Sequence, residues 1–157
     1  MRFLPHLLAL LLAVLLSVVS AFASGEPTVL PTDAEPLVIE TRAGEVSFSV
    51  ELAVTPGTRA SGLMHRQNME ADHGMLFRFD QTRQVLMWMK NTPLPLDMLF
   101  IDEAGTIVGI AEGTTPFSES IVASPGPVRY VLELNAGTAT RQGIAVGDTA
   151  RHRVIAQ

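Results

Sequence analysis

Most of the chain after residue 36 consists of short runs in which apolar and polar residues alternate. In the clearest run, the apolar positions are Val46, Phe48, Val50, Leu52 and Val54. The residues between them, Glu51 included, are mostly polar. A period of two predicts a strand with one face in the core and the other in water. A short apolar strand over residues 37–41 precedes this run, and residues 42–44 predict the tight turn between the two.

Six further strands are predicted from short apolar or alternating runs bounded by turn residues. They cover residues 75–79, 85–90, 98–101, 106–111, 129–134 and 149–155. The second of them is apolar on both faces, as expected of a central strand. The three prolines of residues 114–127 predict a long surface loop.

Two short helices interrupt the strands. Thr55 followed by Pro56 is a helix-start signal, and the spacing of Ala60, Leu63 and Met64 predicts an amphipathic helix to about residue 66. Gly62 weakens that helix, which suggests a packing reason for a glycine there. A second helix is predicted between a cap at Asn135 and a stop at Gly143. About eight strands and two helices predict a β-rich α+β fold, closed or nearly closed, with a barrel favoured over a sandwich.

The N-terminus has the pattern of a secretory signal. Arg2 precedes an apolar run over residues 7–16, and Ala21-Phe22-Ala23 fits the cleavage site. We therefore expect a signal peptide over residues 1–23, a flexible tether over 24–36, and one globular domain over 37–157. The expected location is outside the cytoplasm, in the periplasm or secreted. An uncleaved membrane anchor is the alternative, although the dense apolar run is short for a membrane span.

Composition, net charge and missing motifs exclude several classes of function. The chain has no cysteine, which excludes disulfides and lipid attachment through an N-terminal cysteine. Its net charge is −5 with Lys90 as the single lysine, so the basic face that binds nucleic acid is not expected. Hydrolase, zinc-protease and nucleotide-binding motifs are absent, and the sequence indicates no cofactor or metal. A small molecule or an envelope protein remains as partner, no membrane span is expected after cleavage, and the oligomeric state stays open.

One segment gathers polar groups beside an apolar wall. Trp88, Lys90, Asn91, Thr92 and Asp97 lie at the end of a predicted strand and around a turn with two prolines. An apolar wall with a few convergent polar groups is typical of a small-molecule site. The same residues could instead close the turn, with Asp97 accepting from Lys90, Arg66 or the nearby backbone N–H groups.

Glu133 is the second candidate carboxylate. It lies opposite the face that carries Tyr130, Leu132 and Leu134. If that opposite face lines a lumen, Glu133 and Asp97 could form the carboxylate pair of an acid–base catalyst. If it faces solvent, Glu133 is an exposed glutamate or the partner of Arg66.

Methionine and histidine suggest a third interpretation. Soft thioethers and imidazoles in an exported protein would suit copper, and the candidates are Met64, His65, Met69, His73, Met75, Met87, Met89 and Met98. Because several of these lie in predicted strands, core packing explains them as well. His152 stands apart in the last strand.

Several motifs together resemble a known family, the bacterial and archaeal domain of unknown function 192. In chain order they are Gly62-Leu63-Met64-x-Arg66, Gly74-Met75-Leu76-Phe77, Trp88-Met89-Lys90-Asn91-Thr92, Leu96-Asp97, residues 131–137 (VLELNAG) and Gly147-Asp148. The resemblance covers residues 37–155 and implies a compact β-rich domain without an established activity.

The sequence thus leads to a functional hypothesis with two alternatives. We expect a non-catalytic small-ligand-binding or accessory module of the cell envelope, with Arg66, Trp88, Lys90, Asn91, Thr92, Asp97 and Glu133 as candidate ligand contacts. The first alternative is a small periplasmic enzyme that uses Asp97 and Glu133. The second is a copper-binding protein.

Overall fold

The computed structural model describes residues 25–155, and the predicted signal peptide lies outside these residues. Seven strands form one sheet in the order β5-β4-β6-β3-β2-β1-β7. The strands are β1 (Leu37–Thr41), β2 (Gly44–Ala53), β3 (His73–Met87), β4 (Leu96–Ile101), β5 (Ile107–Thr114), β6 (Val122–Asn135) and β7 (Thr149–Arg151). Two short helices, α2 (Pro56–Ser61) and α3 (Thr138–Gln142), complete the fold. No helix within residues 25–155 is long and apolar enough to cross a membrane.

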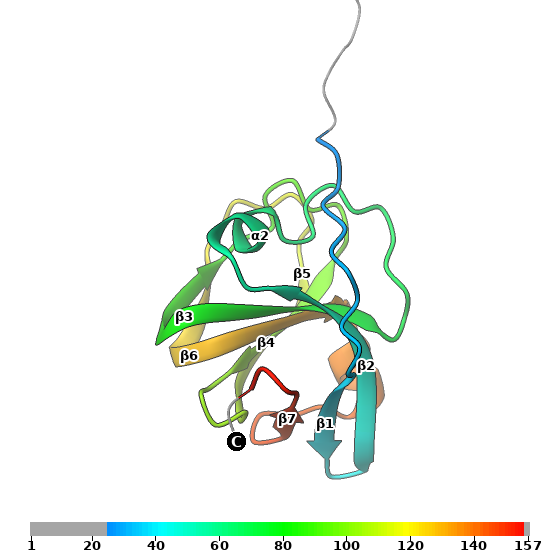
Figure 1. The fold of residues 1–157 in the computed structure, drawn as a ribbon, viewed down its shortest axis with the longest axis vertical. Coiled ribbons are helices and arrows are strands. Elements are labelled where there is room, and N and C mark those ends of the chain that lie inside the picture. Colours follow the sequence, from blue (N-terminus) through cyan, green and yellow to red (C-terminus); the bar gives the residue numbers. More distant parts are fainter. Residues whose placement is uncertain (1–24, 156–157) are drawn as a thin grey trace, which may run out of the picture.

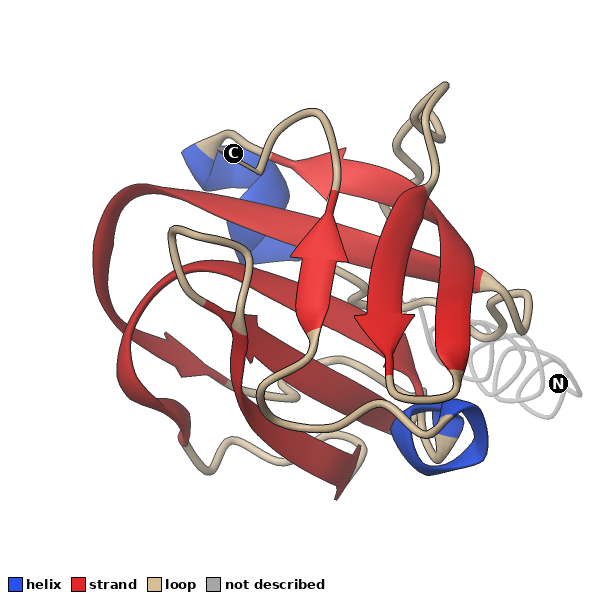
Figure 2. Cartoon of the chain, turned by 90° about the horizontal axis from the view of Figure 1, so that it is seen from below, coloured by secondary structure: helices blue, strands red, loops and turns tan. Residues whose placement is uncertain are grey.

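The sheet curls into a half-barrel, with α2 on the opposite side of the β3–β6 pair from β1 and β7 (Figure 1). Figure 2 shows the curl from below, with the helices at opposite ends of the sheet. All neighbouring strands are antiparallel except β2 and β3, which pair in parallel. The β-rich class is therefore confirmed, whereas closure and an eighth strand are not. Among the described residues, the isolated bridge Thr106–Thr149 links the β5 end of the sheet to the β7 end.

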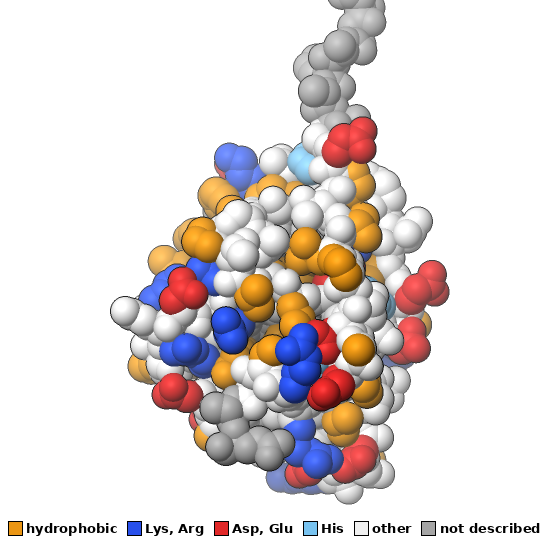
Figure 3. All heavy atoms as spheres, viewed as in Figure 1, with side chains coloured by type: hydrophobic (Ala, Val, Ile, Leu, Met, Phe, Trp, Pro, Cys, Tyr) orange, Lys and Arg blue, Asp and Glu red, His pale blue; other side chains and the backbone are white. Residues whose placement is uncertain are grey.

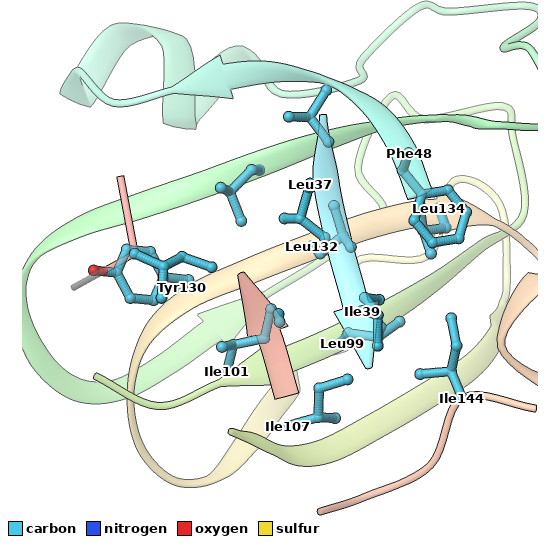
Figure 4. Close-up of a cluster of buried hydrophobic side chains, with 14 of the residues drawn as sticks. Leu37, Ile39, Phe48, Leu99, Ile101, Ile107, Tyr130, Leu132, Leu134 and Ile144 are labelled. Carbon is cyan, nitrogen blue, oxygen red and sulfur yellow. The ribbon is translucent and has the colours of Figure 1, made fainter. Parts of the chain in front are cut away.

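Two apolar clusters pack on the two faces of the sheet. The inner cluster fills the hollow of the curl, and Figure 4 shows the side chains of β1, β4 and β6 converging there. The second cluster lies on the outer face, under α2 and the loops that follow β3. Strand β4 is buried along its whole length and contributes alternate residues to each cluster. A polar residue in such a strand is buried whichever way it points.

Several predicted boundaries were wrong, each because tertiary pairing overrides local pattern. The two strands expected over 75–79 and 85–90 are one bent strand, β3, since β6 pairs along its length with two register shifts. The proline-rich segment is largely strand, because β6 begins at Val122 and its prolines sit near those irregular positions. The last strand ends at Arg151.

The helices also differ from expectation. Helix α2 ends at Ser61, because Gly62 adopts a φ of 46°, which stops the helix. Helix α3 is preceded by Gly137, and the side chain of Asn135 instead donates to the carbonyls of Met69 and Glu70. The stop at Gly143 is confirmed.

Candidate functional site

A small pocket lies between the end of α2 and the outer face of the sheet, and Glu133 of β6 is part of its wall. The segment from Arg59 to Met64 forms one side of it, and Phe77, Met87, Trp88 and Thr92 complete it. Its free volume is about 30 Å³, enough for one or two water molecules. Trp88 is 44 % exposed, so its indole stands at the mouth. Apolar walls around a single carboxyl are the main chemical character of the pocket.

The side chain of Glu133 is buried and makes no hydrogen bond or ion pair within the described chain, so its carboxyl oxygens have only the small space of the pocket open to them. The residue is 4 % exposed. Burial raises the pKa of Glu133 to about 8, because the charged form loses its hydration and gains nothing in return. At neutral pH the group is therefore mostly a neutral carboxylic acid, able to donate one hydrogen bond and to accept others.

The rim of the pocket is strained. Among the described non-glycine residues, His65, Asn91 and Phe117 have a positive φ, of 65°, 54° and 60°. All three lie in the loops around this pocket, and backbone hydrogen bonds join those loops. The His65 N–H donates to the Asn91 carbonyl over 2.7 Å, and the Phe117 N–H donates to the Thr92 carbonyl over 3.0 Å. Residues held in this conformation cluster at functional sites, where the surroundings stabilise the strain.

Gly62 contributes to the shape of the pocket. Besides its positive φ, a Cβ at this position would lie 3.2 Å from Cζ of Phe77. The chain can therefore turn sharply out of α2 and pass close over the ring. This close approach places Leu63 and Met64 at the pocket and supplies the packing reason that the sequence suggested for a glycine.

The loop predicted as the site divides into two parts. Trp88 and Thr92 line the pocket, and the Thr92 hydroxyl donates to the Lys90 carbonyl over 3.1 Å. Lys90 turns to the surface, where its Nζ lies 5.2 Å from the centre of the Trp88 ring and 3.2 Å from Glu119. Asn91 is exposed and contributes through its backbone. The segment thus supplies part of the wall and the rim of the pocket, whereas the buried carboxyl comes from Glu133.

Asp97 lies on the other face of the sheet. In the β4–β6 register Asp97 is opposite Leu134, while Glu133 is opposite Met98, so alternation directs the two carboxyls to opposite faces. Asp97 is completely buried and accepts three backbone N–H groups, from Gly113 at 2.9 Å, Gly137 at 3.1 Å and Ala139 at 2.9 Å. The donors expected from the sequence, Lys90, Arg66 and the Asn91–Thr92 backbone, are not its partners. The structure does not bring Asp97 and Glu133 together.

Arg66 belongs to a separate polar cluster. Its guanidinium binds both oxygens of Glu51, at 2.9 and 2.6 Å, and His73 Nε2 lies 3.0 Å from the same carboxylate. Glu51 is 2 % exposed, so its predicted position on a solvent face was wrong. Burial acts to raise the pKa of Glu51, but hydrogen bonds from Arg66, His73 and the Leu30 backbone outweigh it and hold the pKa below its ordinary value.

The segment before β1 covers this cluster. The Leu30 N–H donates to Glu51 over 2.7 Å, and the Thr28 carbonyl accepts from two nitrogens of Arg66. Further along, the Asp33 N–H donates to the Val50 carbonyl, and the Asp33 carboxylate pairs with Arg153. The prediction of a tether over 24–36 did not anticipate these contacts. We refer to residues 28–33 as the N-terminal strap.

Methionine and histidine do not converge on one point. Met75, Met89 and Met98 are buried in the outer core cluster, whereas Met64 and Met87 line the Glu133 pocket. His73 is bonded to Glu51, and the buried His152 lies against the Glu35 carbonyl. No group of three or more histidine, aspartate or glutamate side chains placed to hold a metal ion occurs in residues 25–155.

We expect the Glu133→Gln variant to be more stable than wild type at pH 8, by about 4 kcal/mol, and to be within about 1 kcal/mol of it at pH 5. The pKa of Glu133 is about 8 in the folded state against an ordinary 4.5, so folded protein holds a proton that unfolded chain has released. The contribution of Glu133 to the free energy of unfolding is fully present below pH 4.5 and is lost as the pH rises towards 8. Urea unfolding across this range measures the difference. Glu70→Gln, at an exposed position, is the matched control, and equal pH profiles for wild type and Glu133→Gln would contradict the prediction.

Sequence reasoning missed most of the wall of the pocket. Arg59 and Ser61 were not proposed as site residues, and Met64 and Met87 were considered only for copper. The available signal was Gly62 inside a predicted helix, which marked a close approach at this point.

Comparisons with known proteins agree with the fold and give no activity. The chain is 52 % identical to a Sinorhizobium meliloti 1021 protein described as a proposed transcription regulator, with a TM-score of 0.75 over 81 % of this chain and 97 % of that one. It is 32 % identical to a protein of unknown function from Novosphingobium aromaticivorans DSM 12444, also with a TM-score of 0.75, over 85 % and 99 % of the two chains. No curated protein matches. The family profile of DUF192, described as "Uncharacterized ACR", matches residues 38–152, so the chain belongs to the DUF192 family.

Proposed function

We propose that this domain is a non-catalytic small-ligand-binding module and that its ligand enters the Glu133 pocket. The observation that carries the proposal is the buried, unpartnered carboxyl of Glu133 at the wall of that pocket. A buried polar group without a partner costs free energy of folding, on the order of 1–3 kcal/mol. Such a cost is expected where a ligand supplies the missing partner, because binding sites trade stability for function.

The three left-handed residues at the rim support the same site. His65, Asn91 and Phe117 come from separate loops, and each takes part in a backbone hydrogen bond that joins two of these loops beside the pocket. Their shared location gives a second, independent reason to place the function here.

The enzymatic alternative receives less support. It requires Asp97 and Glu133 in one pocket, but the two carboxyls lie on opposite faces of the sheet. Both oxygens of Asp97 are engaged by backbone N–H groups, as befits a structural carboxylate.

The description of the Sinorhizobium protein as a proposed regulator does not extend to DNA binding by this chain. The net charge is −5, and the face in Figure 3 carries basic, acidic and apolar side chains interspersed. Affinity for nucleic acid depends on neutralising phosphates with a basic surface. We place the module in the cell envelope on the N-terminal pattern alone. A mature protein that starts at Ser24 by mass spectrometry supports this location, and one that starts at Met1 opposes it.

Methionine-methyl NMR tests the binding site directly. The probes are small fragments with cationic, neutral or anionic heads, added to protein with ¹³C-labelled methionine methyl groups. We expect at least one class of head to shift the Met64 and Met87 signals saturably, while Met69, beside the strap, does not move. The fragments should be recovered chemically unchanged.

Two variants control this experiment. Ala60 is exposed and lines the mouth, so Ala60→Trp should block the pocket and abolish the shifts, whereas Ala60→Ser should keep them. The proposal is wrong if no class of head shifts Met64 and Met87, or if the shifts survive Ala60→Trp.

A further inference from the structure

We propose that the Glu133 pocket binds the primary ammonium head of a small amine. The inference rests on the proposed function, because it identifies the class of ligand for the same pocket. Three properties of the pocket lead to it: the hydrogen bonds that its lining can still make, its size, and the charges that face it.

The one cationic side chain in the lining is already paired with a carboxylate and two backbone carbonyls. Arg59 donates to the Val54 carbonyl at 2.8 Å and the Arg78 carbonyl at 2.9 Å, and its other terminal nitrogen binds Asp80 at 2.8 Å. Because Arg59 is already paired with Asp80, an anionic head would find only the proton of the neutral Glu133 acid to bind, and it would be repelled once Glu133 ionises. Carboxylates and phosphates should therefore lose affinity as the pH rises towards 8, where an ammonium gains affinity.

The remaining polar groups of the lining can all accept hydrogen bonds. The acceptors are the carboxyl of Glu133 and the hydroxyl oxygens of Ser61 and Thr92. The hydrogen of the Thr92 hydroxyl is directed to the Lys90 carbonyl, which leaves its oxygen free to accept. The indole of Trp88 at the mouth adds an apolar surface, since one face of its ring already holds Lys90 Nζ at 5.2 Å. An ammonium group has three N–H donors and no acceptor, which matches this set.

Size favours a primary amine over larger cations. The free volume of about 30 Å³ holds a group the size of one or two water molecules. An –NH₃⁺ head is of that size, whereas a quaternary ammonium is bulkier and has no N–H for Glu133. A bare divalent cation is also a poor fit, because calcium takes six to eight oxygen ligands and the lining offers a single carboxylate. The alkyl part of the amine would lie along Trp88, towards solvent.

Binding an ammonium changes the protonation of Glu133. The carboxyl gives its proton to solvent and becomes the counter-ion of the ammonium, so one proton is released for each amine bound. The other charged residue in the lining is Arg59, neutralised by Asp80, and Lys90 pairs with Glu119 outside the lining. The neighbours of Glu133 from β3 and β4 on the same face, Met75 and Met98, are uncharged. Affinity should therefore rise with pH up to about 8, the pKa that burial gives Glu133.

The test compares four probes by titration of the Met64 and Met87 methyl signals: n-butylamine, n-butanol, butyrate and tetramethylammonium. We expect n-butylamine to bind at least tenfold more tightly than the other three at pH 8. Its dissociation constant should decrease about fiftyfold from pH 6 to pH 8, because the ionised fraction of Glu133 rises from about 1 % to about half. In the Glu133→Gln variant the amine should lose at least tenfold in affinity, together with its pH dependence. Glu70→Gln should behave as wild type.

The outcomes separate the two proposals. Butanol, butyrate or tetramethylammonium binding as tightly as the amine would overturn the amine inference and leave the binding function in place. A pH-independent affinity of wild type for the amine would overturn it as well. If no fragment of the wider panel shifts the Met64 and Met87 signals, the proposed function itself is wrong. Because Glu133→Gln is expected to be at least as stable as wild type, its loss of binding cannot be attributed to unfolding.

Discussion

Replacing Arg66 with methionine should lower the free energy of unfolding by about 4 kcal/mol, because it leaves the buried carboxylate of Glu51 with only His73 and the Leu30 N–H as partners. Arg66 binds both oxygens of Glu51 and holds the Thr28 carbonyl of the strap. Methionine keeps the apolar stem and removes the charge. The measurement is the urea midpoint at constant slope. Arg151→Met, which breaks an exposed pair with Glu40 and Glu45, is the control and should cost under about 1 kcal/mol.

The pH dependence of this effect has a definite sign. The pKa of Glu51 lies below its ordinary 4.5 in the folded state, so its contribution is present above pH 4.5 and is lost as the pH falls further. The gap between wild type and Arg66→Met should therefore shrink below pH 4.5. The double variant Arg66→Met with Glu51→Gln should recover part of the loss, since no buried charge remains. A double variant no more stable than Arg66→Met alone would contradict this account.

Asp97→Asn should destabilise the domain by about 3 kcal/mol, since it disrupts a buried, charge-assisted set of hydrogen bonds. Oδ1 accepts from Gly113 and Gly137, and Oδ2 accepts from Ala139. Asparagine can keep one of these oxygens, but its NH₂ group would then point at an N–H donor. The carboxylate joins the end of β5 to the start of α3, so the loss should affect both elements.

Urea unfolding of Asp97→Asn at neutral pH measures this cost. The control is Asp72→Asn, at an exposed position, which should change stability by less than about 0.5 kcal/mol. A midpoint for Asp97→Asn equal to wild type would mean that the three bonds contribute little, and it would return Asp97 to the candidate ligand contacts.

Local pattern predicted the strands that end at clear turn residues. Residues 37–41 and the hairpin of β4 and β5 were located because short apolar or alternating runs are bounded there by turn residues. Glu51 was misplaced for a long-range reason: the strap, some twenty residues upstream, covers what would otherwise be a solvent face. Alternation reports which residues share a face, but not what covers that face.

The candidate site shows the same limit of local sequence pattern. Glu133 and Thr92 were proposed from their chemistry, and both line the pocket. Asp97 was grouped with Glu133 because both are carboxylates in apolar runs, yet only the register of β4 against β6 decides that they face apart. The segment 59–64 meets Glu133 through the parallel pairing of β2 with β3, which no local signal reveals.

The pairing of β1 with β7 has a consequence for how the chain folds. Val38, Ile39 and Glu40 are in register with Arg151, Ala150 and Thr149, so one of the first strands completes its hydrogen bonds with the last. During synthesis, the sheet cannot reach its final form until residue 151 has left the ribosome. Contacts between residues so distant in sequence slow folding into the range of milliseconds to seconds, because the chain must first close a long loop. The nascent chain therefore lacks its complete sheet for almost the whole of its synthesis.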